Sequence, residues 1–188
     1  MTCLASTFLF QISLLLVFFL FINPSSTNPT EKVTNDIIKE ICSETENPTF
    51  CSQVLSSNPQ ITNNTDIRGL AKISIDLAYA SAKETSTIIE PLLKQESNSG
   101  YKEEYAFCSN NYGEAVLDLE DATRLLEKGD YKGLHEQALS AMDAAEDCEV
   151  LFEVPPPPND NSQLQEKIQN FVNLCSINLA VSDRLQKL

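Results

Sequence analysis

Apolar and small residues recur every three or four positions along most of this chain, which is the spacing of one face of an α-helix. Four such stripes lie between residues 65 and 188. The first two consist of Ile67, Leu70, Ser74, Leu77, Ser81, Thr85, Ile88 and Leu92, and of Tyr105, Cys108, Tyr112, Ala115, Leu119, Ala122 and Leu126. The last two consist of Leu134, Ala138, Ala141, Ala145, Cys148 and Phe152, and of Leu164, Ile168, Phe171, Leu174, Ile177, Val181 and Leu185. The pattern predicts four long amphipathic helices.

Helix caps and helix breakers divide these stripes. Thr65 or Asp66 can cap the first helix, because either side chain can accept a hydrogen bond from a free backbone amide. Gly129 ends the second helix, Asp130 can cap the third, and the prolines at 155–158 end it. Short connections make neighbouring helices antiparallel. Residues 65–188 are therefore predicted to form an all-α, up-down-up-down four-helix bundle.

A smaller element precedes the predicted bundle. Residues 33–43 form one short helical run, and a second run ends at Leu55, with a turn around Pro48 between them. Residues 33–56 are therefore predicted to form a helical hairpin.

The first thirty residues contain no Asp, Glu, Lys or Arg, and residues 14–22 (LLLVFFLFI) are entirely apolar. Small residues and a proline follow at 23–27, which is typical of the exit from a secretory signal peptide. We therefore expect residues 1–27 to be a cleaved leader and residues 28–188 to be a secreted domain that is free of the membrane after cleavage. An uncleaved anchor is the alternative, because the apolar stretch approaches membrane-spanning length.

Five cysteines follow the leader, and secretion makes disulfide pairing the default. Cys42 and Cys51 lie close enough in sequence to close the predicted hairpin. Cys108 lies in the first half of its helix and Cys148 in the second half of the next, so antiparallel helices bring them together. A chain-entropy model assigns about 2.7 and about 3.9 kcal/mol to these two bridges. Cys175, on an apolar stripe, is predicted to be a free, buried thiol.

The chain carries 27 acidic and 13 basic residues, a formal net charge of −14, and all of them follow position 30. The charge therefore belongs to the expected secreted domain. Such a polyanion disfavours nucleic acid and anionic membranes as partners, and it favours a cationic protein surface.

Candidate chemistry is sparse. His135 is the only histidine, the cysteines lack the spacing of a zinc site, and glycine-rich phosphate loops are absent. Pairs of carboxylates could serve glycoside hydrolysis, but the sequence offers no aromatic-lined cleft to accompany them. We therefore expect a non-enzymatic protein without cofactor or metal. Asn63 begins a glycosylation sequon in a polar linker and is expected to carry a glycan, with an unused sequon as the alternative.

The cysteines lie among longer recognisable segments: residues 41–51 (ICSETENPTFC), 74–83 (SIDLAYASAK), 105–108 (YAFC), 111–112 (NY), 129–131 (GDY), 148–149 (CE) with Phe152, and 174–175 (LC). With five cysteines in register with this order of helices, residues 37–188 resemble the plant invertase and pectin methylesterase inhibitor family. The resemblance implies a four-helix bundle preceded by a helical hairpin. It also implies bridges from the first to the second and from the third to the fourth cysteine, in agreement with the pairing above.

The resemblance leaves two classes of target enzyme. Invertase inhibitors of the family carry a Pro-Lys-Phe element, which would fall on residues 131–133 (YKG) here, and only Lys132 matches. Residues 129–131 and 74–83 resemble the pectin methylesterase inhibitors instead. We therefore expect a pectin methylesterase as the target, with an acid invertase as the alternative.

The resemblance also implies how such an inhibitor works. Polar faces of the bundle helices cover the pectin-binding cleft of the esterase in a one-to-one complex in the plant cell wall, the apoplast. The matching or neighbouring carboxylates in this chain are Glu114, Asp118, Asp130, Asp143 and Glu149. Leu117 and Val150 stand where esterase inhibitors often have acidic residues, and these departures are expected to weaken affinity, change which isoform is recognised or shift the pH dependence. A secreted carrier of a small apolar ligand, or a family member without inhibitory activity, are further alternatives.

Overall fold

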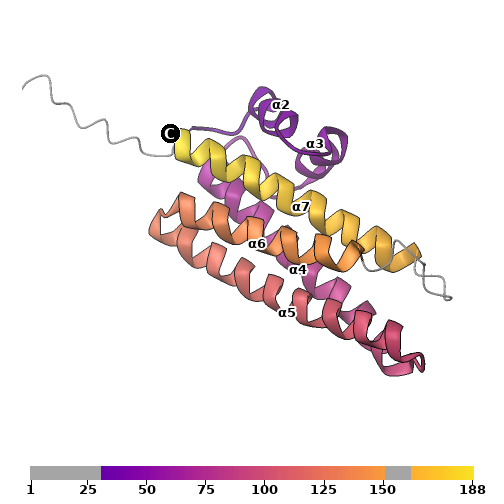
Figure 1. Ribbon diagram of the computed structural model, residues 1–188. Helices are drawn as coiled ribbons and strands as arrows, with labels where there is room; N and C mark the ends of the chain where they lie inside the picture. Colours follow the sequence, from indigo (N-terminus) through magenta and orange to yellow (C-terminus); the bar gives the residue numbers. More distant parts are fainter. Residues whose placement is uncertain (1–30, 151–161) are drawn as a thin grey trace, which may run out of the picture.

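The computed structural model describes residues 31–150 and 162–188, and the regular elements of these residues are all helices (Figure 1). Two short helices, α2 (Asn35–Ser43) and α3 (Pro48–Ser57), precede four long ones, α4 (Ile67–Gln95), α5 (Ser99–Lys128), α6 (Tyr131–Val150) and α7 (Ser162–Lys187). The predicted all-α bundle behind a helical hairpin is confirmed. The expected leader over 1–27, as well as Phe152 of the third stripe, lies outside the described residues.

The four long helices form an antiparallel bundle in which α4 and α6 each contact both α5 and α7 (Figure 1). Helices α2 and α3 contact each other and α7, so the hairpin covers the outer side of the last helix. No described helix is long and apolar enough to cross a lipid bilayer.

The connection between α5 and α6 is two residues long. Gly129 adopts a left-handed backbone with φ of 74°, a conformation that costs little only without a Cβ atom. The side chain of Asp130 then accepts a hydrogen bond from the Gly133 amide at 2.9 Å, which caps α6. At the start of α4 the capping residue is Asp66, whose carboxylate accepts from the Gly69 amide at 2.7 Å.

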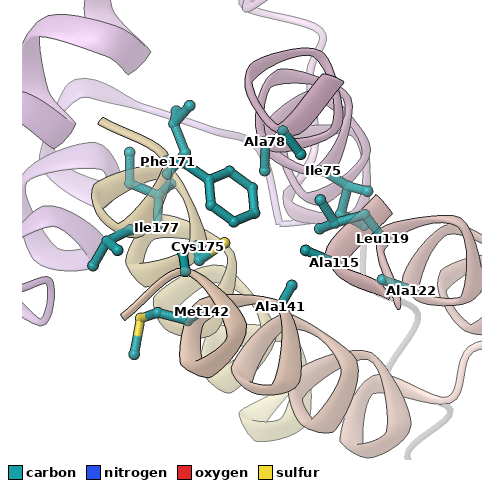
Figure 2. Close-up of a cluster of buried hydrophobic side chains, with 14 of the residues drawn as sticks. Ile75, Ala78, Ala115, Leu119, Ala122, Ala141, Met142, Phe171, Cys175 and Ile177 are labelled. Atoms are coloured by element: carbon teal, nitrogen blue, oxygen red, sulfur yellow. The ribbon is translucent and has the colours of Figure 1, made fainter. Parts of the chain in front are cut away.

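Small side chains line much of the bundle interior and let the helices approach closely. Ala78, Ala115, Ala122 and Ala141 face the cluster around Phe171 in Figure 2, and all are almost completely buried. The ring of Tyr112 packs against Phe171 with centroids 5.4 Å apart. The interior is therefore filled by helix–helix packing, which argues against a carrier that holds a ligand along the bundle axis.

The buried face of α4 differs from its predicted stripe. Leu77, Ser81, Ile88 and Leu92 are only half-buried, whereas Ala78, Ala82 and Ile89 are fully buried in their place. The buried residues Ile67, Ala71, Ser74, Ala78, Ala82, Thr85 and Ile89 follow one another at intervals of three or four residues, close to the length of a helical turn. Leu77, Ser81 and Ile88 of the predicted stripe therefore lie one residue before the buried face of α4.

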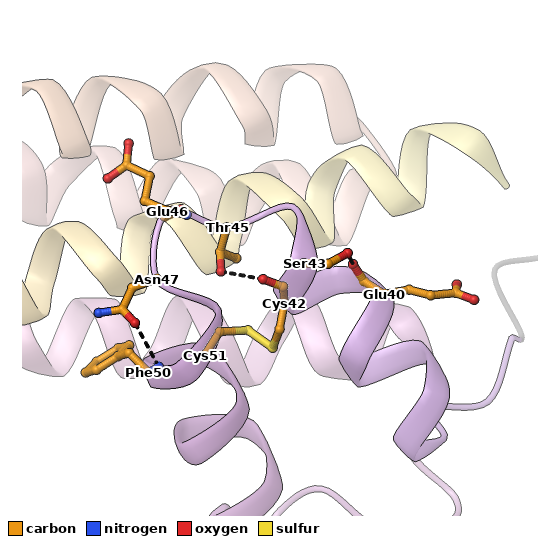
Figure 3. Close-up of a disulfide and its surroundings, with 9 residues drawn as sticks. Glu40, Cys42, Ser43, Thr45, Glu46, Asn47, Phe50 and Cys51 are labelled. Carbon is orange, nitrogen blue, oxygen red and sulfur yellow. Dashed lines mark hydrogen bonds between the residues drawn. A yellow bond between two sulfur atoms is a disulfide. The ribbon is translucent and has the colours of Figure 1, made fainter.

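Both predicted disulfides are present in the structure. Cys42 and Cys51 join the two helices of the hairpin (Figure 3), and Cys108 and Cys148 join α5 to α6. The turn between α2 and α3 is held by Asn47, whose side chain accepts a hydrogen bond from the Phe50 amide at 3.1 Å.

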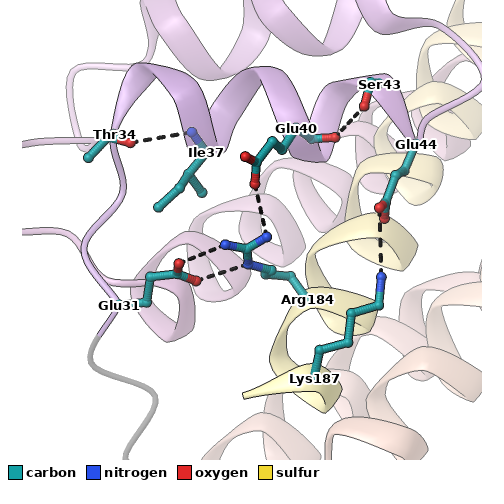
Figure 4. A network of polar contacts seen from close by, with 8 residues as sticks. All are labelled: Glu31, Thr34, Ile37, Glu40, Ser43, Glu44, Arg184 and Lys187. Atoms are coloured by element: carbon teal, nitrogen blue, oxygen red, sulfur yellow. Dashed lines mark hydrogen bonds and ion pairs between the residues drawn. The ribbon is translucent and has the colours of Figure 1, made fainter.

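Arg184 near the end of α7 holds the N-terminal segment against the bundle (Figure 4). Its guanidinium donates to both carboxylate oxygens of Glu31, at 2.9 and 2.6 Å, and to Glu40 of α2 at 3.0 Å. The hydrogen bond from Arg184 lowers the pKa of Glu31. The backbone of the same segment also pairs with the chain at the start of α4. The Ile67 amide donates to the Glu31 carbonyl at 3.0 Å, and the Val33 amide donates to the Thr65 carbonyl at 2.9 Å.

We expect Arg184→Met to lower the free energy of unfolding by about 1–2 kcal/mol, because it keeps the aliphatic stem and removes a bidentate ion pair that is less than one-third exposed. Glu31 has a lowered pKa, so its contribution is present above the ordinary carboxyl value of 4.5 and is lost as the pH falls through the folded-state pKa. The difference between variant and wild type should therefore shrink in acid. Urea unfolding at several pH values, with amide exchange in α2 and α3, measures both effects.

Lys187→Met is the matched control for this experiment. The Lys187 ammonium lies 3.7 Å from Glu44 and both side chains are more than half exposed, so the loss should stay below about 0.5 kcal/mol. Equal losses for the two variants would contradict the anchoring role of Arg184.

Candidate functional acidic surface

The outer surface of α5 and α6 carries an unusually one-sided charge. Residues 103–123 and 136–150 contain eleven Asp and Glu residues and no Lys or Arg. Each helix buries one regular stripe in the bundle, and none of these carboxylates belongs to it: five are exposed and six are half-buried. We call the outer surface formed by these two segments the acidic surface.

The disulfide between Cys108 and Cys148 sets which residues of the acidic surface lie level with one another. Asn111 confirms this register, because its side-chain amide donates to the Ala144 carbonyl at 3.0 Å. Glu114 on α5 therefore lies level with Asp143 on α6, within about one residue. Both side chains are exposed, and neither has a hydrogen-bond or ion-pair partner within the described residues.

Asp118 lies one turn closer to the α5–α6 connection and is half-buried. Glu114, Asp118 and Asp143 therefore lie close in height along the helix axes, in the part of the acidic surface nearer the α5–α6 connection. The other two carboxylates predicted to contact a partner lie elsewhere.

Asp130 and Glu149 stand at opposite ends of α6. Asp130 caps the helix, so its carboxylate is engaged with the Gly133 amide, and a side chain at Gly133 would approach that carboxylate to 2.8 Å. Glu149 is half-buried near the core. Burial raises the pKa of Tyr112, and the charge of Glu149 adds to that effect. Asp130 therefore has a structural role, and Glu149 faces partly inward.

Sequence reasoning missed Glu146, which lies at the centre of the acidic residues of α6. Burial raises the pKa of this carboxyl, and the charges of Glu46, Asp143, Glu149 and Asp147 raise it further. Glu46 belongs to the turn of the hairpin, and its backbone amide donates a hydrogen bond to the Ser176 hydroxyl of α7 at 3.1 Å. No local pattern links residues 46 and 146, so only the fold could identify this group.

Four exposed apolar side chains also belong to this surface. Among the described residues, the large hydrophobic side chains that are exposed are Phe107 (45%), Leu117 (60%), Leu139 (39%) and Val150 (63%), and all four lie on α5 or α6. Leu117 and Val150 stand at positions that sequence comparison had singled out. Phe107 and Leu139 were missed, although they are apolar residues out of phase with the buried stripes.

The groups that could support nucleophilic chemistry are poorly arranged for it. Nδ1 of His135 lies 3.1 Å from the Ser182 hydroxyl and 3.0 Å from Asp183, so the hydroxyl and the carboxylate share one ring nitrogen. A catalytic triad needs them on opposite nitrogens. Cys175 is free and completely buried, and burial raises the pKa of its thiol far above the usual range. No group of metal-ligating side chains occurs within the described residues.

The sequon residue Asn63 lies in the loop between α3 and α4, and its side chain is exposed. The loop is tied down on both sides, by the Thr65 hydroxyl, which accepts from the Thr62 amide at 2.9 Å, and by Lys32, which donates to the Asn64 carbonyl at 2.7 Å. A glycan at this position would extend into solvent, on the hairpin side of the molecule.

Comparison with known proteins gives consistent results. The family model described as plant invertase/pectin methylesterase inhibitor matches residues 36–181. A pectinesterase inhibitor from Actinidia deliciosa is 43% identical over 183 residues, which cover 97% of this chain and 95% of that protein. Pectinesterase inhibitor 2 from Arabidopsis thaliana is 34% identical over 79% of this chain and 83% of its own length. The crystal structure of a mutant form of an Arabidopsis pectin methylesterase inhibitor superimposes with a TM-score of 0.70 at 27% identity, covering 78% of this chain and 95% of that one.

Glu146→Gln is expected to raise the free energy of unfolding at pH 7, because it removes a charge that burial and four neighbouring carboxylates destabilise. A carboxyl whose pKa is raised in the folded state lowers the free energy of unfolding as the pH rises through that pKa. At low pH the carboxyl is protonated in both the folded and the unfolded state and has no such effect. The gain should therefore vanish as the pH falls below the ordinary value of 4.5. Urea unfolding between pH 3.5 and 7 measures it.

The matched control is Glu166→Gln, which removes one charge from an exposed position on α7. If both variants gained the same stability, overall net charge rather than the crowding around Glu146 would be the cause.

Proposed function

We propose that this chain, which belongs to the plant invertase/pectin methylesterase inhibitor family, inhibits a pectin methylesterase by occluding its pectin-binding cleft. The observation that carries this proposal is the identity of 43% over nearly the full length of a pectinesterase inhibitor. Through such inhibition the protein regulates the methylesterification of cell-wall pectin. The complex contains one inhibitor and one enzyme.

The charge of the acidic surface supports this mechanism. An enzyme that processes an anionic polysaccharide needs cationic and polar groups along its cleft. A rigid bundle whose acidic surface carries eleven carboxylates, of which Asp121 and Glu136 pair with Arg124 and Lys132 at its edges, is attracted to such a cleft and blocks it. Glu114, Asp118 and Asp143 are the residues of this surface that we assign to the contact. Asp130 contributes by capping α6, and the assignment of Glu149 to the contact stays a prediction.

The alternative target is an acid invertase. At residues 131–133, where the family's invertase inhibitors carry Pro-Lys-Phe, only Lys132 corresponds, and this lysine lies 3.4 Å from Glu136 on the same helix. The sequence Tyr-Lys-Gly lacks both the proline and the aromatic residue after the lysine. An esterase is therefore the favoured target.

The protein acts outside the cell in this proposal. The uncharged leader over 1–27, the two disulfides and the exposed sequon at Asn63 all suit secretion into the apoplast.

Titration of the purified protein against a pectin methylesterase and an acid invertase, side by side, tests the proposal directly. We expect saturable inhibition of the esterase at one equivalent and unchanged invertase activity. Inhibition of the invertase alone would replace the esterase as the target, and inhibition of neither would contradict an inhibitory function.

The double variant Glu114→Gln/Asp143→Asn should weaken inhibition of the esterase roughly tenfold at low ionic strength, because it removes two exposed carboxylates from the contact. Most of the loss should appear in the association rate and should diminish as salt is added.

The control is Asp76→Asn/Glu90→Gln, which removes the same charge from exposed positions on α4. Their carboxylates pair with Lys72 at 2.8 Å and Lys94 at 3.0 Å, so little stability depends on them. If the two double variants lost inhibition equally, only net charge would matter and the acidic surface would lose its assignment.

A further inference from the structure

The four exposed apolar side chains of α5 and α6 are arranged in two pairs. Leu117 and Leu139 lie level with each other in the register set by the disulfide, and Phe107 lies level with Val150 to within one residue. The pairs are separated by ten residues along α5 and eleven along α6, which corresponds to about 15–16 Å at 1.5 Å per residue.

On each of the two helices, the two exposed apolar residues share a face with a carboxylate that lies between them. On α5, Phe107, Glu114 and Leu117 follow one another at intervals of seven and three residues. On α6, Leu139, Asp143 and Val150 follow at intervals of four and seven. The surface therefore has an apolar pair at each end and unpartnered carboxylates in the middle.

Isolated exposed hydrophobic residues are common on protein surfaces and carry no meaning by themselves. Here, however, every exposed large hydrophobic side chain of the described residues lies on the two helices that form the acidic surface. The parts of a protein interface that become fully buried are more apolar than its rim, so exposed apolar side chains on a charged surface are candidates for those buried contacts.

We propose that four apolar side chains anchor this chain to its target enzyme: Phe107, Leu117, Leu139 and Val150. The cleft of that enzyme then offers two apolar recesses about 15 Å apart, with basic groups between them. This assignment rests on the proposed function. The two kinds of residue have separate tasks. The carboxylates attract the enzyme and set the association rate, whereas the apolar pairs set the lifetime of the complex and are insensitive to salt.

The experiment compares Leu117→Gln/Leu139→Gln with wild-type protein in binding kinetics against the inhibited pectin methylesterase. We expect the dissociation rate to increase about tenfold or more and the association rate to equal that of wild type. The increase in the dissociation rate should be the same at all salt concentrations between 50 and 500 mM. Both leucines are exposed, so glutamine should leave the unfolding transition unchanged. A second variant, Val150→Thr, tests the other pair with a smaller change of the same kind.

The matched control is Val116→Thr, next to Leu117 on the same helix. Val116 is half-buried and lines a groove of about 370 Å³ between α4 and α5, with Gly113 and Lys83, so it faces away from α6. Its substitution should leave dissociation unchanged.

The outcomes separate the two proposals. Wild-type inhibition with unaltered dissociation of both anchor variants would overturn the anchor assignment alone. Variants that change the sedimentation of the free protein but not inhibition would also overturn it, because the leucines would then join copies of this chain. A wild-type protein that binds no pectin methylesterase would remove the proposed function and the anchors with it.

Discussion

The register of α5 against α6 is the constraint on which the candidate surface depends. The disulfide between Cys108 and Cys148 fixes this register near one end of the pair, and the two-residue connection at Gly129 fixes it at the other. A shift by one residue would rotate the outer stripe of one helix by 100° relative to the other. The bridge is usually considered for its effect on unfolded-state entropy, but here it also aligns side chains that a partner must meet together.

Helices α5 and α6 could be predicted almost residue by residue, because their buried stripes keep the three-four spacing. On α7 the predicted stripe is buried as well, but so are residues outside it such as Val172, Asn173 and Ser176, because the hairpin covers the outer side of this helix. All seven predicted core residues of α5 are buried, from Tyr105 to Leu126. Helix α4 deviated from Leu77 onward. The pattern favoured Leu77 because it is the more hydrophobic residue, but the close packing of α4 against α5 and α7 buries its smaller neighbour Ala78 instead.

The candidate site was predictable in its chemistry but not in its shape. The charge of α5 and α6 is evident from the sequence, and Glu114 and Asp143 were correctly expected on exposed positions. Asp130 illustrates an ambiguity, because an aspartate after glycine serves equally well as a cap and as a contact residue. Glu146 and the level pairing of Leu117 with Leu139 depend on residues distant in sequence, and such relations exist only once the helices are packed.

The acidic surface has an energetic cost, and this cost argues for a function. Like charges along adjacent turns repel one another; burial raises the pKa of Glu146, and the charges of Glu46, Asp143, Glu149 and Asp147 raise it further. Cations elsewhere in the chain show that the alternative was available, since α4 pairs Lys72 with Asp76 and Lys94 with Glu90. On α5 and α6 such pairs occur at the edges of the acidic surface, between Asp121 and Arg124 and between Glu136 and Lys132, and no lysine or arginine lies within residues 103–123 and 136–150. A bundle stapled by a disulfide and packed through small residues tolerates this repulsion, and a cationic partner would relieve it on binding. The unfavourable term in the free protein therefore becomes a favourable one in the complex.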